Sequence, residues 1–263
     1  MQDFQPRDRG RSASHDTAGV SHFASQVVSY LADRTARSIS ELREPLVSGL
    51  VSASLTGTRA DFSSLLAEVR RSRIGLAALA DIYIPEAARR MGTSWHEDQL
   101  SWMEVTIGVA RLQSLLREIS AAWSADQAAD KGRGTVMLLV PEGEQHTLGP
   151  MVALGQMRRQ GVSVCLRMGP SQNDLRSILA ERQFDGILIS ISTRERLAAA
   201  ESTVKLLKGV VDKTCPIVVG GAVMSRVEDP ASCIGADLSS NDIGVALGAI
   251  GLNFDASTAL RRA

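Results

Sequence analysis

The sequence predicts an α/β protein in which a helical bundle precedes a doubly wound parallel sheet with helices on both faces. In the first half of the chain, apolar residues recur every three or four positions, which is typical of amphipathic helices. In the second half, short runs of β-branched and other apolar residues alternate with helical stretches. A length of 263 residues is sufficient for about two domains.

Residues 1–20 are expected to form a disordered tail. They are rich in Arg, Ser, Asp and Gln and contain too few apolar side chains to bury a core. The first residues also lack the apolar segment of a signal peptide. His15 lies in this tail and His22 lies just after it, and no positional argument gives either residue a role.

Residues 21–124 are expected to form a bundle of helices, because their apolar spacing places one stripe on each of four or five helices. Pro45 and Pro85 are expected near helix starts or bends, where proline is tolerated. The stripes consist of Val27, Val28 and Leu31; Leu42, Leu46, Leu50 and Val51; Leu65, Leu66 and Val69; Ile74, Leu76, Leu79 and Ile82; and Val105, Val109, Leu112 and Leu116.

Residues 125–134 have few apolar side chains and are expected to link the bundle to a second domain over 135–263. Strands are expected at 135–141, 162–168, 186–192, 216–221 and 236–238, and helices at 148–160, 171–183, 195–212 and 241–253. This alternation predicts a Rossmann-like sheet, which binds ligands beyond the carboxyl ends of its strands.

The composition restricts the classes of function. Lys and Arg together number 29, as do Asp and Glu, so the net charge is zero and no basic field favours direct binding to nucleic acid. No apolar run approaches the roughly 20 residues that span a membrane. Cys165, Cys215 and Cys233 match no zinc-binding spacing and are expected to be reduced thiols in a cytoplasmic protein.

Candidate ligand-binding residues follow three of the expected strands, at what should be one edge of the sheet. A histidine there can ligate a metal through one ring nitrogen while the other donates to a carboxylate that fixes the tautomer. The candidates are Glu144, His146, Thr147 and Gly149 after the first strand, Ser190 and Ser192 at the end of the third, and Gly220 and Gly221 at the end of the fourth.

This arrangement resembles the cobalamin-binding domain of methionine synthase and the mutases, whose pattern is D-x-H-x-x-G, then S-x-L, then GG. The resemblance covers residues 135–263. It implies that His146 is the lower axial ligand of cobalt and that Glu144 occupies the position of the aspartate. It further implies that Ser190 or Ser192 hydrogen-bonds the buried benzimidazole, and that Gly220 and Gly221 leave room for the nucleotide tail. Ser192 replaces the leucine, which predicts a more polar slot.

The segment Met91-Gly92-Thr93-Ser94-Trp95-His96, followed by Trp102 and Glu104, resembles the helix-bundle cap of light-sensing cobalamin regulators such as CarH. Trp95 and Trp102 share a helix face if the helix is continuous. The resemblance implies that Trp95 lies against the upper face of the cofactor and that His96 is a candidate upper ligand. Val105 and Thr106 replace the Glu-His pair of those regulators, which favours hydroxo- or aquocobalamin over adenosylcobalamin.

The run EGEQHTLGPMV, the Trp-His pair and the polar tail resemble the AerR/PpaA antirepressor family of photosynthetic purple bacteria. This resemblance implies a cobalamin-dependent light regulator, and not an enzyme. Such a protein would bind a CrtJ/PpsR-type repressor of photosystem genes and act on DNA only indirectly. Two alternatives remain open: a corrinoid methyl carrier of a methyltransferase system, and a haem-binding redox sensor with the same fold.

Overall fold

The computed structural model describes residues 42–126, 134–211 and 214–252. The expected tail at 1–20, the stripe around Val27, His15, His22 and most of the expected linker lie outside these ranges. The described residues from Pro45 onwards form one compact unit.

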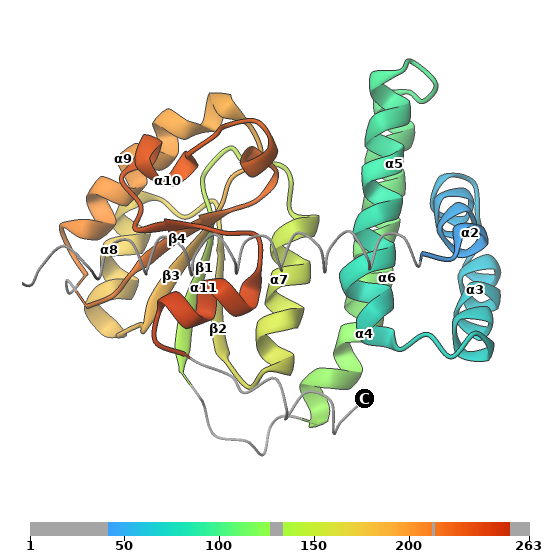
Figure 1. Cartoon of the computed structure of the whole chain (residues 1–263), viewed down its shortest axis with the longest axis horizontal. Coiled ribbons are helices and arrows are strands. Elements are labelled where there is room, and N and C mark those ends of the chain that lie inside the picture. Colours follow the sequence, from blue (N-terminus) through green and yellow to red (C-terminus); the bar gives the residue numbers. More distant parts are fainter. Residues whose placement is uncertain (1–41, 127–133, 212–213, 253–263) are drawn as a thin grey trace, which may run out of the picture. The chain divides into compact units, whose positions relative to one another are not determined.

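Helices fill the first part of the described chain, as predicted. They are α2 (Glu44–Leu55), α3 (Arg59–Arg71), α4 (Leu76–Ala78), the π-helical turn η1 (Leu79–Tyr83), α5 (Ile84–His96) and α6 (Trp102–Asp126). We refer to α2 through α6 as the bundle (Figure 1).

The predicted apolar stripes form the interior of the bundle. Each described stripe residue is buried or half-buried. Leu50, Leu79 and Leu112 are among those that are fully buried. Gly108 lets α6 approach α5 closely, because a Cβ built there would lie 2.7 Å from the Sδ of Met91.

Both prolines lie where helices begin or change type. Pro45 is the second residue of α2. Pro85 is the second residue of α5, directly after the π-helical turn. Pro45 lies in the first turn of α2, where its missing N–H has no helical partner, and Pro85 lies where the π turn passes into α5.

The second part contains a five-stranded sheet of order β2-β1-β3-β4-β5, and every pairing is parallel. The strands are β1 (Thr135–Val140), β2 (Ser163–Met168), β3 (Gly186–Ser190), β4 (Ile217–Gly220) and β5 (Leu238–Ser239). All five predicted strands are present. β1 lies between β2 and β3, so the strand order reverses there, and open sheets of this type bind ligands at such a point.

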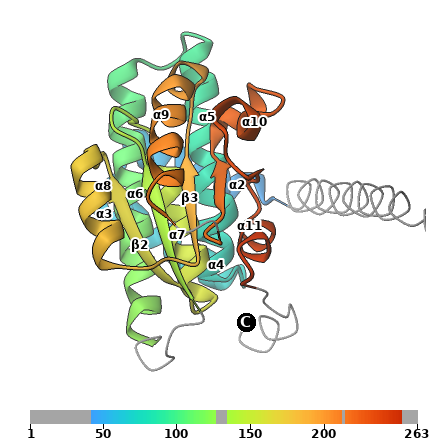
Figure 2. The ribbon, with the colours of Figure 1, turned by 90° about the vertical axis from the view of Figure 1, so that its left-hand side faces the viewer.

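Helices cover both faces of this sheet, which confirms the predicted fold class (Figures 1 and 2). They are α7 (Leu148–Arg159), α8 (Gln172–Glu181), α9 (Leu197–Lys208), α10 (Pro230–Ile234) and α11 (Ile243–Ala249), with 3-10 turns η2 (Arg194–Arg196) and η3 (Ala222–Ser225). The short helix α10 was not predicted, because its five residues are too few to show a helical period.

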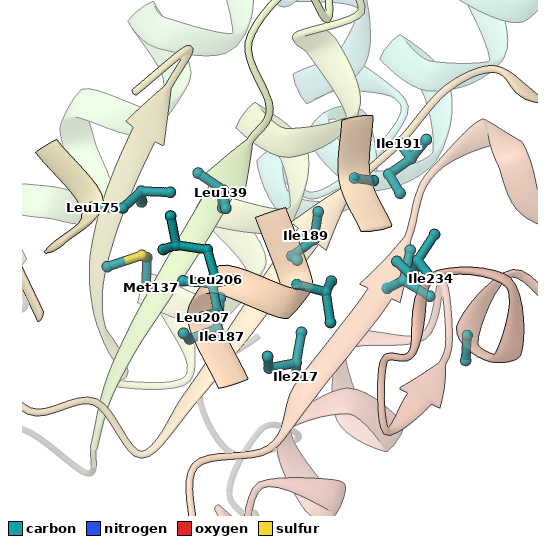
Figure 3. Packing of buried hydrophobic residues seen from close by; sticks show 14 of the residues in the cluster. Met137, Leu139, Leu175, Ile187, Ile189, Ile191, Leu206, Leu207, Ile217 and Ile234 are labelled. Atoms are coloured by element: carbon teal, nitrogen blue, oxygen red, sulfur yellow. The ribbon is translucent and has the colours of Figure 1, made fainter. Parts of the chain in front are cut away.

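The side chains of β1 alternate between two hydrophobic cores. Met137 and Leu139 pack with residues of α8, α9 and α10, among them Leu175 and Leu206 (Figure 3). Val136 and Leu138 belong to the other core, with residues of α7 and α11. Burial on both faces explains why the strand sequences are apolar without a break.

Helix α7 packs against both the sheet and the bundle. It contacts β1 and β2 on one side and α5 and α6 on the other. At its carboxyl end, Nη2 of Arg159 donates to Oδ1 of Asp81 in the π-helical turn, at 2.6 Å. Burial raises the pKa of Asp81 by more than the adjacent Arg159 lowers it. Among the described helices, none combines the length and apolar character needed to cross a membrane.

Candidate functional site

A tight turn after β1 presents the candidate histidine at the carboxyl edge of the sheet. The backbone N–H of Glu144 donates to the carbonyl of Pro141 at 3.1 Å, which closes the turn. Gly143 has a φ of +78°, a conformation that glycine adopts without strain. The chain then passes through His146 and Thr147 into α7, which begins at Leu148.

Glu144 and His146 form a closely held pair. The backbone N–H of His146 donates to Oε1 of Glu144 at 2.9 Å, and Nδ1 of the imidazole lies 2.9 Å from the same oxygen. Because an ionised carboxylate can only accept, Nδ1 carries a proton, and Nε2 is the ring nitrogen that remains for a ligand. The His146 side chain is 70% exposed, whereas that of Glu144 is 2% exposed. The imidazole is therefore oriented from inside the protein and open to a ligand from outside.

Ser192 holds the same carboxylate from the neighbouring strand. Its backbone N–H and its hydroxyl donate to Oε2 of Glu144, at 2.9 and 2.6 Å. Burial by itself raises the pKa of Glu144, but the hydrogen bonds from Ser192 and His146 outweigh it and lower the pKa to about 2. Glu144 is thus a carboxylate at neutral pH that joins the loop after β1 to the loop after β3.

The predicted serines therefore differ in their surroundings. Ser192 is buried and its hydroxyl proton is used within the protein. Ser190 is half-buried at the end of β3, in register with Gly220 of β4. Contact of either serine with a benzimidazole remains a prediction.

The glycine pair is required by the close approach of neighbouring backbones. Gly221 has a φ of +107°, and a Cβ built there would lie 2.3 Å from the carbonyl oxygen of Ile191. A Cβ on Gly220 would lie 2.6 Å from the carbonyl oxygen of Ser240. The side chain of Asn241 also accepts from the backbone N–H of Gly221 at 2.6 Å. These contacts bring the loops after β3, β4 and β5 together, and room for a nucleotide tail remains a prediction.

The first turn of α7 faces open space on one side and the bundle on another. A Cβ built on Gly149 would meet no atom within 4 Å. Thr147 is the N-cap residue of α7 but makes no side-chain cap. Its Oγ1 instead accepts from Nε2 of Gln113 in α6, at 2.8 Å. Gln113 was not predicted, since one glutamine within a helical pattern carries no local signal.

Trp95 and Trp102 do not lie on one continuous helix. Trp95 and His96 are the last two residues of α5, and α6 begins at Trp102. Between the two helices Asp98 has a φ of +57°. The condition for a shared helix face is therefore not met, and the two indoles lie on either side of the turn between α5 and α6. The rings of Trp95 and His96 are adjacent, with centroids 5.2 Å apart.

The two tryptophans are nevertheless largely exposed, at 43% for Trp95 and 64% for Trp102. Met103 and Ile107 of α6 are also exposed, and exposed apolar side chains gathered on one segment are typical of binding surfaces. Glu104 has a local role, because its carboxylate accepts from the backbone N–H and hydroxyl of Ser101 at 2.8 and 2.7 Å and so caps α6.

One face of α6 connects Trp102 with the loop that holds His146. Trp102 and Gln113 are eleven residues apart, about three helical turns, so they share a face and are separated by roughly 16 Å along the axis. Since Gln113 contacts Thr147, Trp102 projects beyond the level of His146 on the face of α6 that meets α7.

The described residues can supply one metal ligand at this edge but not a complete set. No group of three or more His, Cys, Asp or Glu side chains in the described ranges could hold a metal ion. A single imidazole with its Nδ1–H fixed suits a metal whose remaining ligands come from a macrocycle.

No family model matches the sequence. The chain is similar to two solved structures, and the first of them shares its fold. The monomethylamine corrinoid protein of Methanosarcina barkeri is 14% identical, and the alignment covers 78% of this chain and 94% of that one with a TM-score of 0.62. A cobalamin-binding protein from Desulfitobacterium hafniense DCB-2 is 16% identical, with coverage of 78% and 97% and a TM-score of 0.44.

Among curated proteins, the sequence matches the uncharacterized 20.5 kDa protein in the bchF-crtJ intergenic region of Rhodobacter capsulatus. The two are 35% identical over 183 residues, which cover 70% of this chain and 95% of the relative. At this identity and coverage, the chain belongs to the same family as the Rhodobacter capsulatus protein of the bchF-crtJ intergenic region.

Proposed function

We propose that the chain binds a cobalamin through His146 and is a light-responsive antirepressor that binds a CrtJ/PpsR-type repressor of photosystem genes. The observation that carries the cofactor part is the imidazole of His146, which is 70% exposed while its Nδ1 lies 2.9 Å from the buried Glu144 carboxylate. This arrangement orients Nε2 towards one axial position of a metal, which it can ligate as a neutral imidazole.

The fit of a corrin extends beyond this nitrogen. The open space over Gly149 leaves the start of α7 free of side chains where a flat ring would lie. The exposed indoles of Trp95 and Trp102 offer apolar surface for the opposite face of the ring. The fold itself is that of a corrinoid protein from Methanosarcina barkeri, which supports the same class of ligand. Bound cobalamin would supply a cobalt whose upper ligand light can exchange or remove.

The chain's own residues would convert this exchange into a signal. His96 stays a candidate upper ligand because its ring lies beside that of Trp95 at the end of α5. Exchange of the upper ligand would alter the packing of Trp95 and Trp102, and would thereby change the surface of the bundle. Light can shift the population only if the two arrangements of the bundle differ in their affinity for the two ligand states.

The regulatory part of the proposal is supported by the relative. Its name places it between bchF and crtJ, so its gene lies beside that of a CrtJ protein in Rhodobacter capsulatus. A net charge of zero fits action on DNA through a protein partner better than direct binding. We assign no catalytic residue and propose that the chain is not an enzyme.

The methyl carrier is the second candidate, because the corrinoid protein with the same fold is a monomethylamine corrinoid protein. A carrier would accept a methyl group under reducing conditions. A methyltransferase would then remove that group and leave the carrier unloaded. A regulator would instead respond to light without a methyl donor. A haem sensor would take up haem and leave hydroxocobalamin in solution.

The test begins with protein purified without cofactor and kept in darkness. It is mixed separately with hydroxocobalamin and haem, passed through a desalting column, and its absorption spectrum is recorded. We expect retention of hydroxocobalamin, loss of that retention in His146→Ala, and an altered spectrum in His96→Ala if His96 is the upper ligand. Retention of neither cofactor by the unmodified protein would exclude the proposal.

The regulatory part is tested with a purified CrtJ/PpsR-type repressor bound to labelled promoter DNA. We expect loaded protein to release the repressor to different extents in darkness and after illumination. Hydrogen exchange in residues 85–115 should differ between the same two samples. Identical exchange there, together with identical repressor release, would rule out a light-dependent change in the bundle.

A further inference from the structure

Two hydrogen-bonded contacts on consecutive residues connect the sheet, the candidate ligand and the bundle. His146 is held to the sheet, because its backbone N–H and Nδ1 both lie 2.9 Å from Glu144, which accepts from Ser192 at the end of β3. Thr147, the next residue, accepts from Gln113 of α6 at 2.8 Å. A single peptide unit therefore separates the two attachments.

The hydroxyl of Thr147 makes this contact in place of the usual one. A threonine at the N-cap normally accepts from a backbone N–H in the first turn of its own helix. Here no such side-chain bond is present, and the first-turn bond from the N–H of Met151 goes to the backbone carbonyl of Thr147 at 3.2 Å. The side chain is thus oriented by the bundle and not by the helix that it begins.

Gln113 is placed to transmit a displacement along α6. It is half-buried, while its neighbours Leu112, Leu115 and Leu116 are buried in the bundle. It also shares a helix face with Trp102, three turns away. A movement of the loop at His146 would consequently reach a packed helix directly through this hydrogen bond, in addition to the packing of α7 against α5 and α6.

We propose that Gln113 is a positioning residue that couples α6 to the His146 loop, so that occupation of His146 changes the stability of the bundle. This inference rests on the proposed cobalamin site. Because coupling between two sites is reciprocal, the state of the bundle would equally affect binding at His146. The hydrogen bond from Gln113 to Thr147 carries that coupling.

The test compares amide hydrogen exchange of α6 residues 108–119 with and without hydroxocobalamin, for four variants. These residues include Gln113, so direct shielding by the ligand would persist in Gln113→Ala, whereas protection that is transmitted through the hydrogen bond would not. Gln113→Ala and Thr147→Val both remove the hydrogen bond. Gln113→Glu keeps a partner, because the threonine hydroxyl can donate to a carboxylate. Ser114→Ala is the matched control, since Ser114 is exposed and donates to Ala110 within α6 at 3.1 Å.

We expect the cofactor-dependent difference in residues 108–119 to appear in the unmodified protein, Gln113→Glu and Ser114→Ala, and to be absent in Gln113→Ala and Thr147→Val. Combining Gln113→Ala with Thr147→Val should have no further effect, because both act on one bond. An unchanged difference in Gln113→Ala, or in Thr147→Val if the first variant does not fold, would overturn the role of Gln113. Failure of the unmodified protein to take up hydroxocobalamin would instead overturn the proposed function.

Discussion

Glu144 and Ser192 are 48 residues apart in sequence and are joined by two hydrogen bonds from the backbone and hydroxyl of Ser192 to one carboxylate oxygen. The contact crosses from the loop after β1 to the loop after β3, where the strand order reverses. The contact holds the carboxylate of Glu144 in place, and Glu144 in turn orients the imidazole of His146.

Replacing Ser192 by alanine should destabilise the protein by about 1.5–3 kcal/mol, because it removes a buried hydrogen bond to a charged group. The same change should weaken the retention of hydroxocobalamin, since Glu144 would orient His146 less firmly. Urea unfolding and cofactor titration measure the two effects. Ser202→Ala is the control, because Ser202 is exposed and bonds only within α9; equal effects of both variants would refute this role of Ser192.

Acidification should reveal the contribution of Glu144 to stability. Its pKa is about 2 in the folded protein and near its ordinary value of 4.5 when unfolded. The folded value is the lower one, so the contribution is complete above about pH 4.5 and is lost as the pH falls towards 2. The difference corresponds to roughly 3 kcal/mol, as an order of magnitude.

The measurement is the free energy of unfolding from pH 6 to pH 2 for the unmodified protein and for Glu144→Gln. Since other acidic groups titrate in both proteins, only the difference between the two curves reports Glu144. That difference should shrink steadily below pH 4.5. A difference independent of pH would contradict the low pKa.

Two glycine substitutions should separate stability from binding. Gly221→Ala should cost about 1–3 kcal/mol, because its φ is +107° and the new Cβ would meet the Ile191 carbonyl. Gly149→Ala should instead stabilise α7 by about 0.5–1 kcal/mol, because the position is helical and open. Thermal unfolding measures both.

Gly149→Ala should nevertheless weaken hydroxocobalamin binding, since the added methyl group would occupy the space over the start of α7. Binding as tight as that of the unmodified protein would show that the ring does not approach this turn.

Trp102→Ala should leave stability within about 0.5 kcal/mol, because the side chain is 64% exposed. Loss of an aromatic contact worth about 0.5–1.5 kcal/mol should weaken cofactor binding about two- to tenfold. Val210→Ala is a suitable control, since Val210 is an exposed apolar residue that follows α9 at the other edge of the sheet. A binding loss in the control but not in Trp102→Ala would argue against the indole as a contact.

The sequence was sufficient for the sheet and for the position of the site within it. Apolar runs identified all five strands, and the rule that parallel strands end at one edge brought Glu144, His146 and Ser192 together. The contact between Ser192 and Glu144 could not be predicted from the sequence. It depends on where two loops that are distant in sequence approach each other after the sheet has formed.

The break between α5 and α6 was missed although a signal for it exists. Residues 97–101 contain neither glycine nor proline, so no helix-breaking residue marks the end of α5. Ser101 and Glu104, however, form the spacing of a capping box, which marks a helix start. Gln113 differs from this case, because its partner Thr147 lies in another element and no local pattern could reveal it.

The π-helical turn at Leu79–Tyr83 determines the direction in which the end of α5 faces. Each residue of an α-helix advances the chain by about 100° around the axis, and a π turn accommodates one residue more than an α turn. Removing that extra residue would leave a regular α turn, so Trp95 and His96 would keep nearly the same direction relative to Asp81, whose position is set by Arg159. This short segment therefore absorbs a change of one residue in length that a regular α-helix would pass on to both aromatic side chains as a rotation.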